Sequence, residues 1–215
     1  PVSAIVLGTL ASTLLGVAVG SLAIRRQGIY FAMITLALAQ MVYFTALKAP
    51  FTHGEDGISG VPRGKLFGLV SLDSQLATYY FVFAIFLFGY FAIARIIRSP
   101  YGQVLRSIKD NEQRALSLGF NAPAYKLSAF VLSSAFAGLA GSSKAIAFQL
   151  ATLADVHWSL SGEVVLMALI GGVGTLFGPV VGAFCLVMLQ NYLAESGKWV
   201  TVIQGCIFVA CVMLF

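Results

Sequence analysis

Charged and polar side chains in this sequence concentrate in one passage, residues 99–121, whereas most of the remaining chain is apolar. Apolar residues recur at helical spacing along one face of this passage: Leu105, Ile108, Ala115 and Leu116. The other faces carry charged and amide side chains: Arg106, Lys109, Asp110, Glu112, Gln113 and Arg114. This pattern is typical of an amphipathic helix. The chemistry it offers is binding, and two surfaces fit it: the headgroups of a lipid bilayer, or a groove on a soluble partner protein.

Local signals define the end of this helix. Asp110 and Arg114 are four residues apart, a spacing at which opposite charges stabilise a helix by about 0.3 kcal/mol. Gly119 suits a C-terminal cap, and Pro123 prevents the helix from continuing. We therefore expect one helix that ends near residue 119.

Signatures of catalysis and of metal binding are absent from the sequence. It contains no Walker A lysine motif, no nucleophile with an evident base and no zinc signature. The acidic residues within 52–64 lack the spacing of an EF-hand, so a turn-rich loop is expected there. Cys185, Cys206 and Cys211 lie in apolar segments without a CxxC pair, and we interpret them as packing residues. We predict no catalytic residue, no metal site and no cofactor in this chain.

Composition indicates an integral membrane protein. Of 215 residues, 59% are hydrophobic and 10% are charged, and the mean hydropathy is +0.92, whereas about a quarter of the residues of soluble domains are charged. The apolar runs are long and unbroken, as membrane helices require, and lack the short alternation of a barrel. The predicted fold class is all-α, a polytopic transmembrane helix bundle forming a single domain over residues 1–215. Because the sequence starts at Pro1 and stops inside an apolar run, we expect both ends to be truncated.

Charge distribution predicts the topology of the spans. The apolar runs that define them are residues 2–24, a run that begins within 25–40, 76–97 and 127–150. Basic residues outnumber acidic ones in the loop 98–126, so the positive-inside rule predicts that this loop is cytoplasmic. The Gly- and Pro-rich loop 48–75, with balanced charges, is then external. The net charge of +5 is explained by basic residues at the ends of spans, and nucleic acid is not needed to explain it.

Small and polar residues within the spans predict how the helices meet. Small residues recur every four positions in the first span (Ala4, Gly8, Ser12, Gly16 and Gly20) and in the fourth (Ala129, Ser133, Ala137, Gly141 and Ala145). Such ridges let helices approach closely in lipid. In the second span, Tyr30, Thr35 and Gln40 need polar partners, so they are expected to face other helices or a translocation path. Lys144 is expected to extend toward the membrane surface, the alternative being a buried functional charge.

The apolar stretch 159–192 is too long for one straight span and is interrupted by glycine and proline. The interrupting residues are Gly171, Gly172, Gly174, Gly178 and Pro179. We expect two half-helices, broken or re-entrant, near the transport pathway, because irregular backbone at membrane depth needs cover from protein or a water-filled cavity. A close-packing ridge of Gly174, Gly178 and Gly182 is the open alternative. Ser161 is expected to cap the first half-helix, with Glu163 in its first turn.

Several stretches resemble the branched-chain amino acid permease family, the LivM-type membrane subunits of ABC importers. Residues 99–119 resemble its SPxGRxLxAIRxNExxAxxLG segment, residues 25–40 its RGxYFAMxTLAxAQ and residues 52–64 its GGxDGLSGVPR, and residues 159–192 are also similar to the family. The matching residues of the first segment are Ser99, Pro100, Gly102, Leu105, Ile108, Asn111, Glu112, Ala115, Leu118 and Gly119. The general EAA-xxx-G signature of ABC importers is only partly kept, since Gln113 and Arg114 occupy its first two positions.

This resemblance implies that the loop 98–126 holds a coupling helix that seats in a groove of an ATP-hydrolysing subunit. The residues it assigns to coupling are Gly102, Leu105, Arg106, Asp110, Asn111, Glu112, Ala115 and Gly119. The docking prediction depends on Ala115 and Gly119, whose small side chains would allow close approach of a partner.

The resemblance also implies partners and a location. They are a second permease subunit, two ATP-binding subunits that hold ATP and magnesium, an external solute-binding protein, and the lipid bilayer of the bacterial plasma (inner) membrane. The chain itself would be a multi-pass transporter subunit and no enzyme. The alternatives are a permease for urea or another small solute, a secondary carrier or channel, and a membrane-embedded assembly subunit. Carriers often have charged residues at the midplane, and these are scarce here.

Overall fold

The computed structural model describes residues 1–26, 28–52, 54–61, 64–66, 70–71, 74–172, 174–193, 202–203, 205–206, 209 and 213. The chain divides into two compact units, Pro1–Val156 and His157–Phe215. The first unit contains six α-helices within its described residues: α1 (Val2–Ala23), α2 (Ile29–Lys48), α3 (Gln75–Arg98), α4 (Pro100–Asp110), α5 (Glu112–Ser117) and α6 (Ala122–Phe148). The second contains α7 (Trp158–Ile170) and α8 (Gly178–Leu193). The prediction of an all-α polytopic bundle is confirmed.

Four of these helices, α1, α2, α3 and α6, are long and apolar enough to cross a membrane, among the residues that are described. Their bounds follow the predicted spans closely, except that α6 begins at Ala122, five residues before the predicted start. Asn121 explains this early start, because its Oδ1 accepts a hydrogen bond from the Ala124 backbone N–H at 3.3 Å. Pro123 then occupies the first turn, where a missing N–H costs nothing.

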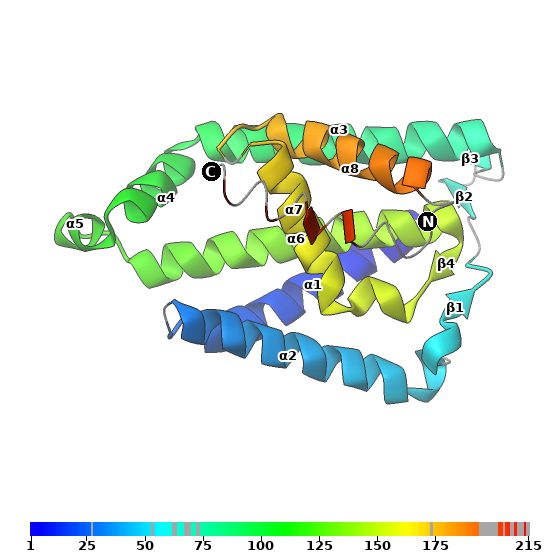
Figure 1. Ribbon diagram of the computed structural model, residues 1–215, viewed down its shortest axis with the longest axis horizontal. Coiled ribbons are helices and arrows are strands. Elements are labelled where there is room, and N and C mark those ends of the chain that lie inside the picture. Colours follow the sequence, from blue (N-terminus) through cyan, green and yellow to red (C-terminus); the bar gives the residue numbers. More distant parts are fainter. Residues whose placement is uncertain are drawn as a thin grey trace. The chain divides into compact units, whose positions relative to one another are not determined.

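The antiparallel pair α1 and α6 makes the most extensive helix contact of the first unit (Figure 1). The predicted ridge of α1 lies in this contact: an added Cβ at Gly16 would lie 2.7 Å from the Cβ of Ser134. One turn further along α1, an added Cβ at Gly20 would lie 2.9 Å from a methyl carbon of Leu127. The Ser12 hydroxyl also donates a 2.7 Å hydrogen bond to the Ser134 carbonyl. Small residues therefore allow this approach, as expected for helices in lipid.

The ridge predicted on α6 is displaced from the one that packs. Ser133, Ala137 and Gly141 are exposed, and an added Cβ at Gly141 would meet no atom. The ridge that contacts α1 contains Ser134, Gly138 and Ser142 instead. Two ridges of small residues run side by side on this helix, and the ridge named from the sequence is not the one that packs on α1.

Short strands and 3-10 turns gather at one end of the first unit. They are η1 (Pro50–Thr52), η2 (Gly54–Asp56), β1 (Ile58–Ser59), β2 (Lys65–Leu66), β3 (Val70–Ser71), β4 (Leu150–Ala151) and η3 (Leu153–Val156). β1 pairs antiparallel with β4, and β2 pairs antiparallel with β3. Figure 1 shows these strands at the end opposite α4 and α5. The described residues of the loop 48–75 and the loop 98–126 therefore lie at opposite ends of the unit.

In the second unit, α7 and α8 are separate helices joined by residues 171–177, so the predicted interruption is confirmed. The predicted cap is wrong: α7 begins at Trp158, and His157 caps it by accepting a 3.3 Å hydrogen bond from the Ser159 backbone N–H. An imidazole nitrogen here does what a serine hydroxyl does at other helix starts. Ser161 and Glu163 consequently lie within the helix.

Candidate functional site

The polar passage after α3 forms two helices, and the prediction of one continuous helix is wrong. Asn111 has extended backbone angles (φ −156°, ψ 100°) between α4 and α5. Its Oδ1 accepts a 3.0 Å hydrogen bond from the Arg114 backbone N–H and so caps the N-terminus of α5. The extended residue destroys the i,i+4 register of Asp110 and Arg114. Asn111 is thus a hinge position between two short helices.

The predicted cap at Gly119 is confirmed. Gly119 has φ +87°, and its backbone N–H donates to the Leu116 carbonyl at 2.9 Å. The Phe120 backbone N–H donates to the Ala115 carbonyl at 3.2 Å. These two bonds form a Schellman motif, which satisfies the last carbonyls of α5 and turns the chain toward α6.

The inside of this turn is a small apolar cluster. Ile108 of α4, Ala115 of α5 and Ala122 of α6 are buried, with Val104 and Tyr125 packed around them. Ala115 is only 1% exposed, so it faces the interior and offers no surface to a partner. That result corrects the expectation that Ala115 belongs to a docking surface. The bend at Asn111 brings α4, α5 and α6 together around the methyl group of Ala115.

Gly102 is likewise enclosed. An added Cβ there would overlap the carbonyls of Ile96 and Ile97 at the end of α3. Its lack of a side chain therefore lets α4 fold back tightly after Ser99. Leu105 is partly buried. Gly102 and Leu105 thus face the protein and help to hold α4 in place.

Polar and aromatic contacts fasten the loop to α6. Lys126 of α6 and Glu112 of α5 form a 2.6 Å ion pair in which both side chains are about one-third exposed. The Tyr101 hydroxyl of α4 lies 2.7 Å from the Ser128 hydroxyl. The Tyr101 ring also stacks on Tyr125, with 5.7 Å between the ring centroids. Sequence reasoning counted Lys126 only as a topological charge and did not predict these contacts, although opposite charges on the two sides of the Gly119 turn were a signal that the turn would bring them together.

The outer side of the loop is exposed and mixed in character. Leu116 and Leu118 are 49% and 69% exposed, and an added Cβ at Gly119 would meet no atom. We call Leu116, Leu118 and Gly119 the tip surface. Exposed polar residues adjoin it in sequence: Arg106, Lys109, Asp110, Asn111, Gln113 and Arg114. Exposed apolar side chains close in sequence to exposed charged ones are a composition found at protein-binding surfaces.

In the second unit, the glycines of the interruption play two different roles. Gly172 and Gly174 have φ values of +94° and +108°, which favour glycine and turn the chain between the helices. Gly171 and Gly178 contact each other through their backbones, and an added Cβ at Gly182 would overlap the Met167 carbonyl. The break is therefore present, and of the alternative ridge Gly178 and Gly182 pack closely, whereas an added Cβ at Gly174 would meet no atom. The Gly178 backbone N–H at the start of α8 donates a 3.0 Å hydrogen bond to the Thr175 hydroxyl.

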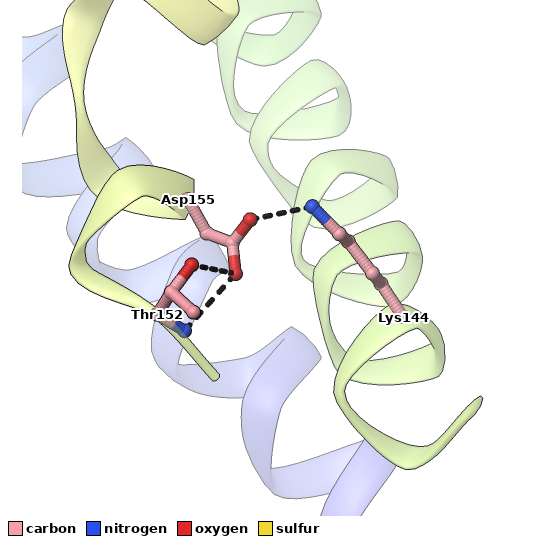
Figure 2. A network of polar contacts seen from close by, with 3 residues as sticks. All are labelled: Lys144, Thr152 and Asp155. Atoms are coloured by element: carbon pink, nitrogen blue, oxygen red, sulfur yellow. Dashed lines mark hydrogen bonds and ion pairs between the residues drawn. The ribbon is translucent and has the colours of Figure 1, made fainter. Parts of the chain in front are cut away.

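At the strand-bearing end of the first unit, Lys144 of α6 is ion-paired with Asp155 of η3 at 2.5 Å (Figure 2). The Asp155 carboxylate also accepts hydrogen bonds from the Thr152 backbone N–H and hydroxyl, at 3.2 and 3.1 Å. Burial opposes ionisation of Asp155, but these hydrogen bonds outweigh it and lower its pKa below the usual value. Lys144 thus holds η3 against α6, and its expected extension toward the membrane surface stays a prediction.

Of the polar residues predicted on α2, Thr35 is satisfied by its own helix and Tyr30 is exposed. The Thr35 hydroxyl donates to the Phe31 and Ala32 carbonyls of its own helix, and Tyr30 is 71% exposed within this chain. Cys185 and Cys206 are exposed free thiols, and Cys211 lies outside the described residues. Among the described residues no group of three or more His, Cys, Asp or Glu side chains is placed to hold a metal ion.

Comparison with known proteins gives consistent matches. The family described as "Branched-chain amino acid transport system / permease component" matches residues 1–212. The chain is 27% identical over 226 residues to the high-affinity branched-chain amino acid transport system permease protein LivM of Salmonella typhimurium strain LT2, covering 94% of this chain and 53% of that protein. It is 25% identical over 217 residues to LivM of Escherichia coli K12, covering 90% of this chain and 51% of that protein. The chain thus spans about half the length of these relatives. No solved structure matches it.

Proposed function

Since this chain belongs to the family of branched-chain amino acid transport system permease components, whose profile covers residues 1–212, we propose that it is a membrane-spanning part of an ATP-driven importer of branched-chain or related amino acids. The family match carries the proposal. The four candidate membrane spans agree with it, and so does the polar loop that forms α4 and α5 between two of them. ATP and magnesium would be held by partner subunits.

We assign the α4–α5 end of the first unit to the cytoplasm of a bacterial cell. Basic residues dominate this end: Arg25, Arg26, Arg95, Arg98, Arg106, Lys109, Arg114 and Lys126, against Asp110 and Glu112. The positive-inside rule counts such residues beside the spans and makes their side cytoplasmic. The strand-bearing end, with the loop 48–75, would face outward, toward a solute-binding protein. Cysteine labelling at Ser59 and at Ser117 from each side of the membrane tests this topology, and labelling of Ser59 from the cytoplasm alone would overturn it.

The tip surface is the proposed seat of an ATP-binding subunit. Leu116 and Leu118 are exposed apolar side chains, whereas Ile108 and Ala115 of the same loop are buried against α6. Binding in a groove of a partner protein would remove the two leucines from water. Of the coupling residues expected from the sequence, Gly119, Arg106, Asp110 and Asn111 are accessible for such a contact. Closure of two ATP-binding subunits would then displace α5, and with it α6, between outward-open and inward-open states of the complex formed with a second permease subunit.

The interruption between α7 and α8 is the proposed position of the transport pathway. Two short helices joined by irregular backbone are the form that transporters use around a substrate, and α7 and α8, at 13 and 16 residues, are each shorter than a full span. Gly172→Leu should block transport, because φ +94° at Gly172 disfavours any side chain. Normal uptake by cells that carry this variant would show that the segment does not line the transport pathway.

Uptake in cells that lack this protein tests the function as a whole. Radiolabelled leucine, isoleucine and valine should enter the deletion strain more slowly than the parent strain, and the wild-type gene should restore uptake. Uptake that persists when an uncoupler collapses the ion gradient but fails on ATP depletion supports an ABC importer. The reverse dependence would indicate a secondary carrier. Loss of urea uptake with normal amino acid uptake in the deletion strain would identify urea as the substrate.

A further inference from the structure

A cavity of about 410 Å³ lies in the first unit, beside the turn between α1 and α2. Its lining comes from the α1–α2 turn with the start of α2, from α5 and from α6: Ile24, Arg26, Gly28, Phe31, Glu112, Lys126 and Phe130. The volume is in the range of sites that hold small molecules. No function proposed above uses this cavity.

The lining is divided between apolar and charged groups. Ile24, Phe31 and Phe130 supply apolar surface, and the rings of Phe31 and Phe130 meet edge to face at 6.3 Å between centroids. The charged groups are Arg26, Lys126 and Glu112. A ligand that fits this lining has an apolar part and an anionic part.

The two cations of the cavity differ in availability. Lys126 is held by Glu112 at 2.6 Å, which neutralises most of its charge. Arg26 is exposed and forms no ion pair with any residue in the described part of the chain. The guanidinium of Arg26 is therefore the group free to bind an anion, and its planar fork suits phosphate oxygens.

The position of the cavity identifies the kind of ligand. Ile24 and Arg26 follow α1, Phe31 is in the first turn of α2, and Lys126 and Phe130 are near the start of α6, so the cavity lies where three candidate spans end together. A bilayer presents phosphate groups at this level and acyl chains directly beside them. Basic pockets between membrane helices at such a level bind the headgroups of anionic lipids.

We infer that this cavity binds an anionic phospholipid, with the phosphate on Arg26 and the part of an acyl chain nearest the headgroup against Ile24, Phe31 and Phe130. A bound lipid would touch both the α1–α2 turn and the Glu112–Lys126 ion pair that fastens α5 to α6. It would therefore join the first two spans to the exposed loop. The lipid site itself does not depend on the proposed transport function.

Lipid retention by the purified protein tests this site. The protein, with any subunits that remain bound, is equilibrated in detergent micelles containing equal amounts of dioleoyl phosphatidylglycerol and dioleoyl phosphatidylcholine, and bound lipid is identified by native mass spectrometry. Phosphatidylglycerol should be retained in preference to phosphatidylcholine. Arg26→Gln should lower this preference about fivefold, the loss expected for one interfacial basic residue, and Arg26→Lys should keep most of it.

Arg25→Gln is the matched control, because Arg25 is the adjacent exposed arginine and does not line the cavity. An equal loss in both glutamine variants would mean general attraction to surface charge and would overturn the site. Excess glycerophosphoglycerol supplies the headgroup without acyl chains and should displace little lipid. Full displacement by this soluble headgroup would instead indicate a site for soluble phosphate compounds, and absence of lipid from wild-type protein with its subunits bound would mean that a partner fills the cavity.

Discussion

Replacing Leu118 by alanine separates docking from folding. Leu118 is 69% exposed, so the isolated chain should lose little stability when the side chain is shortened. Full burial of a leucine side chain is worth about 1.5–3 kcal/mol. If an ATP-binding subunit covers the exposed part, Leu118→Ala should weaken its binding by about 1–2 kcal/mol, which is about a 5- to 30-fold increase in Kd.

The assay is titration of the purified membrane protein with the ATP-binding subunit, together with substrate-stimulated ATP hydrolysis. Phe148→Ala is the matched control, because Phe148 is 73% exposed and lies at the opposite end of the first unit. It should leave the Kd for the ATP-binding subunit unchanged. Equal Kd values for wild type and Leu118→Ala would refute the assignment of the tip surface.

Ala115→Trp, in the same loop, should have a different effect from Leu118→Ala. Ala115 is 1% exposed between Ile108 and Ala122, so a large ring would force the cluster apart at a cost of about 1–3 kcal/mol. Thermal stability and docking should therefore fall together in this variant, whereas Leu118→Ala should affect docking alone.

Three further predictions concern local structure. Asn111→Ala removes the cap of α5 and should cost about 1 kcal/mol of loop stability, visible as faster hydrogen exchange in α5 with α3 unchanged. Gly182→Val should destabilise the α7–α8 pair by about 1–3 kcal/mol, measured by thermal unfolding in detergent, because the new side chain would overlap the Met167 carbonyl. Since its folded-state pKa is lowered, Asp155 stabilises the protein above its unfolded pKa of about 3.9, and this stabilisation is lost as the pH falls through the folded value. Lys144→Met should thus lower thermal stability by less than about 1 kcal/mol at neutral pH, and the difference should vanish in acid.

The spans and the interruption were predictable because their causes are local. An uninterrupted apolar run needs no partner to become a membrane helix, and α3 begins and ends within one residue of the predicted span. Gly172 and Gly174 interrupt the last apolar stretch through their own backbone angles. In these cases the information lies in adjacent residues.

The bend at Asn111 was not predictable from periodicity. The residue fits the amphipathic pattern of one long helix, and it also fits the N-cap of a second helix that begins with Glu112. The choice depends on Ala122, which comes from the next span and closes the cluster with Ile108 and Ala115 only when the chain bends. A contact across the Gly119 turn therefore overrides the helical preference of the intervening residues.

The contacts of the loop also indicate where a displacement of the tip would go. The Glu112–Lys126 pair is partly exposed, so it contributes at most about 1 kcal/mol to holding α5 on α6. The enclosed methyl group of Ala115 must therefore carry most of the attachment of α5, and the Tyr101–Ser128 contact attaches α4 to α6 beside it. Beyond them, α6 is interlocked with α1 through glycine and serine residues that leave no room for sliding. A force on α5 would accordingly move α6 and α1 together, and α4 would pass part of it to α3, because Gly102 of α4 lies against the Ile96 and Ile97 carbonyls at the end of α3.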